Sequence, residues 1–125
     1  MENRKSVLII DDEAMMLELI KKMLEGSYDV SCVNSASAAI HFLNANKVDV
    51  ILLDITMPNI NGFDFLEDIR RIPSYMGAPI IIVSGNTGKE FQDQARNSTA
   101  FDVLTKPVKK DLLIEAIEKS LAKKM

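Results

Sequence analysis

The most uniformly apolar stretch of the chain is Val50-Ile51-Leu52-Leu53, and Asp54 follows it directly. A second stretch of this kind, Val7-Leu8-Ile9-Ile10, ends in Asp11 and Asp12. Short apolar runs without polar breaks are typical of strands buried on both faces of a parallel sheet. Like charges held close together repel one another. If both strands end at the same sheet edge, the three carboxylates indicate that a cation binds there or that one of them does chemistry.

Strand-like runs alternate with segments of helical periodicity along the rest of the chain. The predicted strands cover residues 7–10, 30–33, 48–53, 80–83 and 103–104, and the helical stripes lie within residues 16–24, 36–43, 65–72, 88–98 and 113–121. This order predicts an α/β fold with right-handed crossovers, a doubly wound five-stranded parallel sheet with helices on both faces.

Local signals mark where two of these helices begin. Asn61 and Gly62 predict a turn that starts the third helix, with no role in chemistry. Thr87 and Glu90 have the spacing of a capping box at the start of the fourth helix. That helix has only Phe91 and Ala95 as apolar anchors, so it is expected to pack weakly on the sheet.

Polar residues fall at the predicted strand ends, where ligands bind in open parallel sheets. The residues expected to share one pocket are Asp11, Asp12, Asp54, Ser84 and Lys106. Each has a structural alternative, and for Asp54 it is to cap a helix or end a strand. Asp11 and Asp12 also suit the first turn of a helix, where acids favour the dipole, and Ser84 and Lys106 also suit an exposed loop.

Length and composition set further limits. At 125 residues and 47% hydrophobic content, the sequence predicts one domain with a substantial core. A net charge of −3 argues against direct binding of nucleic acid. The single Cys32 cannot form an intramolecular disulfide, and the sequence contains neither a secretion signal nor a long apolar segment. We therefore expect a soluble, cytoplasmic protein without membrane contact.

Four pieces of the sequence resemble the CheY-like response regulator receiver domain of two-component signalling. They are Ile10-Asp11-Asp12-Glu13, the ten residues from Leu53 to Gly62, Val83-Ser84-Gly85 and Leu104-Thr105-Lys106-Pro107, each at a predicted strand end. The resemblance spans essentially the whole chain. It implies a flavodoxin-like sheet with strand order 2-1-3-4-5, and one receiver domain over residues 1–125 without an output domain. It also implies a cis bond before Pro107, where cis is least costly.

The resemblance implies phosphoryl transfer to Asp54 from a phosphohistidine on a sensor histidine kinase or a histidine phosphotransfer protein. A carboxylate is ionised at neutral pH, so it needs no general base. An anionic nucleophile that meets an anionic phosphoryl group does need positive charge at the phosphoryl oxygens. Lys106 is expected to supply part of this charge, and the Ser84 hydroxyl is expected to bond a phosphoryl oxygen.

A divalent cation is expected to supply the rest of the charge. By resemblance its ligands are Asp12, Asp54 and the backbone carbonyl of Thr56, with Asp11 acting through water. Oxygen ligands with room for water suit Mg²⁺ or Mn²⁺. The chain is then a phosphorylated signalling domain rather than an enzyme, and assists only its own phosphorylation and dephosphorylation.

The expected output is contact with a downstream protein through the surface of the fourth helix, fifth strand and fifth helix, where Phe91, Gln94 and Phe101 are candidates. One departure from the family pattern affects this switch. Val103 stands where receivers commonly carry Tyr or Phe. Phe101 lies two residues earlier, so strand alternation predicts that it points to the same face. Switching is therefore expected to use Ser84 and the weakly packed fourth helix.

Other functions remain open at this point. Within the same family, the chain suits a phosphorelay intermediary or a receiver fragment of a larger regulator. Residues 84–88 also resemble a flavodoxin phosphate loop, which would make the protein a flavin-binding electron carrier, but here this loop follows the fourth strand instead of the first. A phosphatase with an aspartyl nucleophile is the third class. It requires a second Asp where this chain has Thr56.

Overall fold

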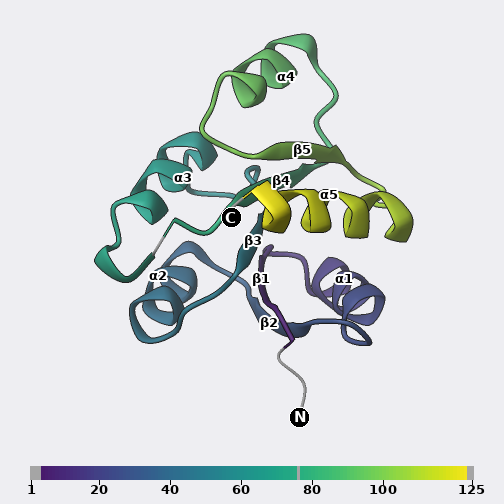
Figure 1. The fold of residues 1–125 in the computed structure, drawn as a ribbon. Helices are drawn as coiled ribbons and strands as arrows, with labels where there is room; N and C mark the ends of the chain where they lie inside the picture. Colours follow the sequence, from purple (N-terminus) through teal and green to yellow (C-terminus); the bar gives the residue numbers. More distant parts are fainter. Residues whose placement is uncertain (1–3, 76, 124–125) are drawn as a thin grey trace.

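The computed structural model describes residues 4–75 and 77–123. Within them one parallel sheet has the order β2-β1-β3-β4-β5 (Figure 1). Its strands are β1 (Ser6–Ile10), β2 (Asp29–Val33), β3 (Val50–Leu53), β4 (Ile80–Ser84) and β5 (Asp102–Thr105). The α-helices are α1 (Ala14–Leu24), α2 (Ala36–Ala45), α3 (Gly62–Arg70), α4 (Lys89–Arg96) and α5 (Lys110–Lys123), with a 3-10 turn, η1, at Pro73–Tyr75. The predicted doubly wound sheet and its strand order are confirmed.

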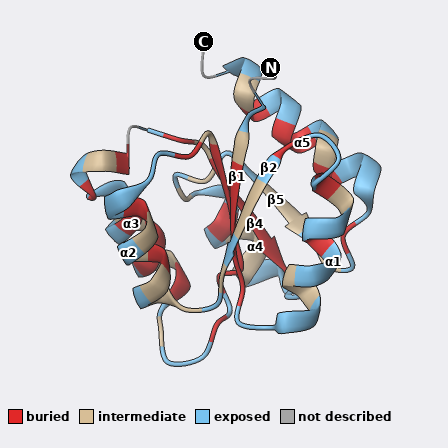
Figure 2. Cartoon of the chain, turned by 90° about the horizontal axis from the view of Figure 1, so that it is seen from below, coloured by how far each residue is buried: buried red, intermediate tan, exposed pale blue. Residues whose placement is uncertain are grey.

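The helices cover both faces of the sheet, as predicted. Helices α1 and α5 lie on one face, while α2, α3 and α4 lie on the other (Figure 1). Successive strand residues point to opposite faces. Leu8 accordingly packs with the α2–α3 side and Ile9 with the α1–α5 side. Because both faces are covered, the central strands are buried except at Ser6 (Figure 2), which is why each contains an apolar run of four residues.

Several predicted boundaries shift by a few residues. Val48 is buried but precedes β3, and Ile72 is buried in the turn after α3. The capping box at Thr87 is wrong: Gly88 is the N-cap of α4, and no side chain accepts a cap hydrogen bond there. The physical reason lies one residue earlier, since Asn86 Oδ1 accepts a hydrogen bond from the Gly88 amide and turns the chain before the helix begins.

The start of α3 agrees with the sequence prediction. Asn61 is its N-cap, and Asn61 Oδ1 accepts hydrogen bonds from the amides of Phe63 and Asp64. A glycine is needed at position 62 for a steric reason. A Cβ added there would lie 1.9 Å from the carbonyl oxygen of Ile55. The helix therefore approaches the segment after Asp54 more closely than any side chain allows.

A cis peptide bond joins Lys106 to Pro107, as the resemblance implied. The parallel strand directions bring the carboxyl ends of all the strands to one edge of the sheet. No helix in the described part of the chain is both long enough and apolar enough to cross a bilayer.

Candidate functional site

Three acidic residues converge at the carboxyl edge of the sheet. Asp11 and Asp12 follow β1, and Asp54 follows the neighbouring strand β3. Asp11 is 2% exposed and Asp54 is 4% exposed, whereas Asp12 is open to solvent. One carboxylate oxygen from each lies within 4.8 Å of the others. The sequence prediction that these acids meet is therefore correct in geometry.

The Lys106 side chain reaches back from the end of β5 into this acidic cluster. Its Nζ lies 3.0 Å from Asp11 Oδ2, 3.5 Å from Asp54 Oδ2 and 3.4 Å from Glu13 Oε1. The lysine side chain is 15% exposed, so its charge is only partly screened by water. One ammonium group thus neutralises part of a cluster of buried carboxylates.

Burial and mutual contact shift the pKa values of two of these groups. Burial raises the pKa of Asp11, and the negative charge of Asp54 adds to this, while hydrogen bonds from the Glu13 amide and Lys106 oppose it. Burial alone would lower the pKa of Lys106, but the hydrogen bond to Asp11 and the charge of Asp54 outweigh it and raise that pKa. Lys106 therefore remains a cation throughout the neutral range.

The Asp54 carboxylate is held by the segment that follows it. Thr56 donates two hydrogen bonds to Asp54 Oδ1, from its amide at 3.0 Å and from its hydroxyl at 2.8 Å. The other oxygen, Oδ2, faces Lys106. The two oxygens of this side chain therefore lie in different surroundings, one bonded to the backbone turn and the other directed into the acid cluster.

Ser84 lies at the end of β4, on the strand between β3 and β5. It is buried, and its carbonyl accepts a hydrogen bond from the Lys106 amide at 2.9 Å. Its hydroxyl accepts a hydrogen bond from the Asn86 amide at 3.1 Å. The backbone thus places Ser84 and Lys106 next to each other at the edge where the acids gather.

The acid cluster fits a divalent cation. Two direct ligands of one ion lie at most twice the metal–oxygen distance apart, which is about 4.2 Å for Mg²⁺ and about 5 Å for Ca²⁺. The carboxylate oxygens of Asp11, Asp12 and Asp54 lie within 4.8 Å of one another, which suits direct binding of the larger ion and suits Mg²⁺ when one acid binds through water. All the donors are oxygen atoms, and the exposed Asp12 leaves a side open to water, as Mg²⁺ prefers.

Two contacts in this site were absent from the sequence prediction. The sequence indicates Glu13 only as part of a motif, yet its carboxylate lies 3.4 Å from Lys106 Nζ across the sheet edge. Thr56 was considered for its backbone carbonyl, whereas the contact seen at Asp54 is made by its hydroxyl and amide. The acidic character of Glu13, next to Asp11 and Asp12, was the only available signal for the first contact.

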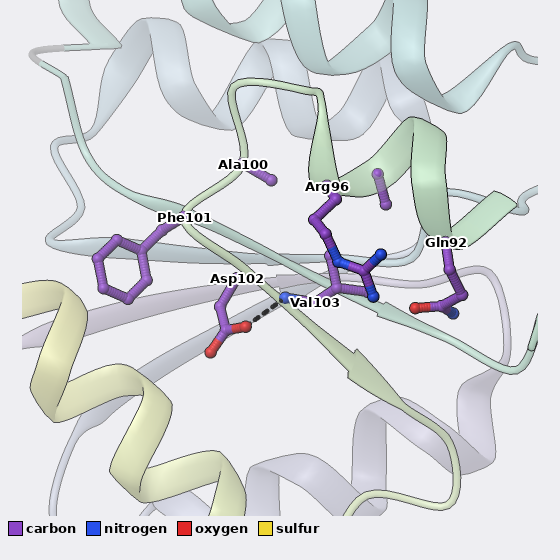
Figure 3. Close-up of a pocket in the computed structure, with 7 residues that line it drawn as sticks. Gln92, Arg96, Ala100, Phe101, Asp102 and Val103 are labelled. Carbon is purple, nitrogen blue, oxygen red and sulfur yellow. Dashed lines mark hydrogen bonds between the residues drawn. The ribbon is translucent and has the colours of Figure 1, made fainter. Parts of the chain in front are cut away.

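A hollow of about 220 Å³ lies between α4 and β5. Val103 lies at this hollow, and the side chains of Gln92 and Arg96 extend beside it from α4 (Figure 3). Phe101, like Val103, is one of the residues that line this hollow. Its ring extends away from Arg96 and Gln92 (Figure 3), and the residue is 36% exposed. Phe101 precedes the first residue of β5, so regular strand alternation does not apply to it.

Comparison with known proteins gives one consistent result. The family model of the response regulator receiver domain matches residues 7–118. A protein-glutamate methylesterase/protein-glutamine glutaminase from Burkholderia thailandensis is 40% identical over 106 residues, which cover 81% of this chain but 29% of that protein. Transcriptional regulatory protein YvrH of Bacillus subtilis is 37% identical over 86% of this chain and 44% of its own length. The chain thus spans less than half of each of these two relatives.

Solved structures show the same fold. A CheY-like receiver domain protein from Methanospirillum hungatei has a TM-score of 0.86 at 27% identity, over 97% of this chain and 96% of that one. The receiver domain of the sensor histidine kinase PA1611 from Pseudomonas aeruginosa, which has a magnesium ion in its active site cleft, has a TM-score of 0.85 over 95% of this chain and 98% of that one. Its identity is 22%, so this second likeness concerns the fold alone.

Proposed function

Since the chain belongs to the response regulator receiver domains of two-component signalling, we propose that Asp54 is its phosphoacceptor and that a histidine kinase or histidine phosphotransfer protein supplies the phosphoryl group. The observation that carries this proposal is the pairing of a 4% exposed Asp54 carboxylate with the ammonium of Lys106 inside a cluster of acids. A buried carboxylate between other acids is costly unless positive charge is brought to it.

In the proposed reaction the Asp54 carboxylate attacks phosphorus without prior loss of a proton. The Thr56 amide and hydroxyl fix one of its oxygens, so the carboxylate is oriented before the donor arrives. Lys106 stays protonated and its Nζ lies 3.5 Å from the other oxygen, Oδ2. From this position the ammonium can stabilise the negative charge that develops on the phosphoryl oxygens. We assign Ser84 to a phosphoryl oxygen, because its hydroxyl lies at the next strand end.

Asp12 and Asp54 are proposed as direct ligands of Mg²⁺ or Mn²⁺, with Asp11 acting through water and the Thr56 carbonyl completing the protein ligands. When bound, the cation supplies positive charge to the phosphoryl oxygens. The mutual distances and oxygen donors of the acids support this assignment. Asp11 suits the indirect role because Lys106 already occupies one of its oxygens at 3.0 Å.

The output is proposed to be a contact with a downstream protein on the surface formed by α4, β5 and α5. Gln94 is exposed and Phe101 partly so, while Phe91 is half buried with its ring centroid 5.7 Å from that of Phe63. Helix α4 buries only Ala95, so its position is weakly determined by packing. Phosphorylation would then act by shifting the population of α4 positions.

The proposal is limited to a cytoplasmic receiver role over residues 1–125. The methylesterase activity in the name of the Burkholderia relative is a property of that longer protein. We propose that this chain carries no turnover chemistry beyond its own phosphorylation and dephosphorylation.

Intact mass spectrometry after incubation with acetyl phosphate tests the assignment. We expect a gain of one phosphoryl group that requires Mg²⁺ in the parent and does not occur in Asp54→Asn. Sustained hydrolysis of a phosphate ester would instead identify an aspartyl phosphatase, and flavin absorbance in the purified protein would identify an electron carrier. Labelling of Asp54→Asn to the parent's extent would contradict the assignment of Asp54.

A further inference from the structure

Glu13 is directed at the same ammonium group as the buried acids, although it lies outside the acid cluster. Its Oε1 lies 3.4 Å from Lys106 Nζ, and its side chain is 63% exposed, so it lies on the solvent side of the site. Glu13 is the N-cap residue of α1, yet its side chain caps no amide of that helix. The side chain therefore contacts Lys106, which follows β5, instead of capping α1.

This position affects any anion that approaches Asp54. Glu13 Oε1 and Asp54 Oδ2 each lie within 3.5 Å of Lys106 Nζ, so they are no more than 7 Å apart. A unit charge at that separation acts strongly on another charge in a partly solvated pocket. Because Glu13 is on the solvent side, an incoming donor meets its negative charge before it reaches the nucleophile.

Glu13 also competes for the cation that the reaction needs. Lys106 is shared among Asp11, Asp54 and Glu13, and the hydrogen bond to Asp11 is the shortest of the three. To turn toward a phosphoryl group, the ammonium has to weaken these contacts. An exposed carboxylate that also binds Lys106 therefore adds to the restraint on its movement.

Building on the proposed role of Asp54, we propose that Glu13 determines donor specificity by acting against small, highly anionic phosphoryl donors. It does so by charge repulsion and by holding Lys106, without contact with the reacting atoms. In the reaction that it modulates, an Asp54 oxygen forms a bond to phosphorus as the bond from phosphorus to the leaving group breaks. With acetyl phosphate the leaving group is acetate, which departs with the bonding electron pair. A phosphoryl group brought by a partner protein is less affected, since protein contacts hold the donor in place.

The test compares labelling rates of the parent, Glu13→Gln and Glu13→Asp with two small donors, at limiting and at saturating Mg²⁺. Acetyl phosphate is a dianion near neutral pH and phosphoramidate a monoanion. The matched control is Glu115→Gln, which removes the same charge from a side chain that is 57% exposed and lies 3.2 Å from Lys119 on α5. Rates are measured by intact mass at low and at high salt.

We expect Glu13→Gln to be labelled roughly threefold to tenfold faster than the parent by acetyl phosphate at low salt, from one unit charge at about 7 Å. The gain should be smaller with phosphoramidate and should shrink at high salt, because added ions screen a partly exposed charge. Glu13→Asp, which keeps the charge but shortens the side chain, should be labelled more slowly than Glu13→Gln, and Glu115→Gln should resemble the parent.

Several results would overturn this role. One is a Glu13→Gln rate equal to or below the parent's, and another is a gain that is the same for both donors and insensitive to salt. A gain that disappears once Mg²⁺ is saturating would show that Glu13 acts on cation affinity instead. Failure of the proposed function is distinct, since then the parent itself would not be labelled or Asp54→Asn would be.

Discussion

Replacing Lys106 by Met should destabilise the folded protein in the absence of divalent cations. The substitution keeps much of the side-chain volume and removes the positive charge that lies within 3.5 Å of Asp11 and Asp54. Both carboxylates are almost fully buried, so water cannot replace the lost partner. Their nearest ligand atoms lie within 4.8 Å of each other, and this repulsion becomes uncompensated.

The expected loss in unfolding free energy is about 3 kcal/mol near pH 7.5. Breaking a buried ion pair by removing one partner costs about 3 to 5 kcal/mol in other proteins, because the remaining charge is left without compensation. The loss in unfolding free energy has an upper limit, because one of the two acids can become protonated instead of remaining charged. Moving the pKa of a carboxyl from about 3.9 to above pH 7.5 corresponds to about 5 kcal/mol.

Urea unfolding followed by far-UV circular dichroism, with EDTA present, measures this loss. The control is Lys109→Met, which removes the charge of an exposed lysine nearby and should change stability by less than about 0.5 kcal/mol. The gap between parent and Lys106→Met should narrow to no more than about 2 kcal/mol near pH 5.5, because a carboxyl with a raised pKa then protonates at lower cost. Adding Mg²⁺ should also reduce the difference in unfolding free energy between the parent and Lys106→Met. A loss below about 1 kcal/mol, or one that Mg²⁺ and acid leave unchanged, would refute the reasoning.

Three further predictions follow from the same structure. Gly62→Ala should lose at least about 2 kcal/mol of stability in urea unfolding, because its Cβ would meet the Ile55 carbonyl, whereas Gly26→Ala, with nothing within 4 Å, should lose little; equal effects would contradict this steric account. The raised pKa of Lys106 contributes stability that is complete below the unfolded lysine pKa of about 10.4 and is lost as pH rises through the folded value, so the parent should lose more stability than Lys106→Met on alkaline titration. Asp12→Asn should leave stability in EDTA within about 0.5 kcal/mol of the parent but reduce the Mg²⁺-induced gain, which is about 2.7 kcal/mol at a hundredfold excess over Kd for an intact site; an undiminished gain would remove Asp12 from the ligand set.

The fold was largely predictable because its signals are local and repeated. Each central strand is a short apolar run that is buried on both faces, as Ile80–Ser84 illustrates. Each helix has apolar residues at its own period, and parallel strands joined by helices allow few arrangements. The errors lie where neighbouring turns compete. Asn86 turns the chain before α4 and displaces the capping role predicted for Thr87.

The composition of the acid cluster was also predictable, since carboxylates that end parallel strands must lie at one edge. The direction of each side chain within it was not. The same holds outside the cluster for Phe101, which lies just before β5, so strand alternation does not decide the direction of its ring. Residues in the segments between elements have no fixed period, so their direction depends on the surrounding packing.

The amino-acid sequence by itself determined the sheet and the acids at its edge, because periodicity and strand polarity are properties of consecutive residues, and its resemblance to receiver domains supplied the strand order. Only the tertiary structure decided that Lys106 is shared with Glu13, which lies 93 residues earlier, and that Thr56 holds Asp54 through its hydroxyl. The first contact joins residues at the ends of separate strands, and the second depends on the rotamer of the Thr56 side chain. The distances between these side chains depend on how all the strands pair in the folded sheet, and no local sequence pattern encodes them.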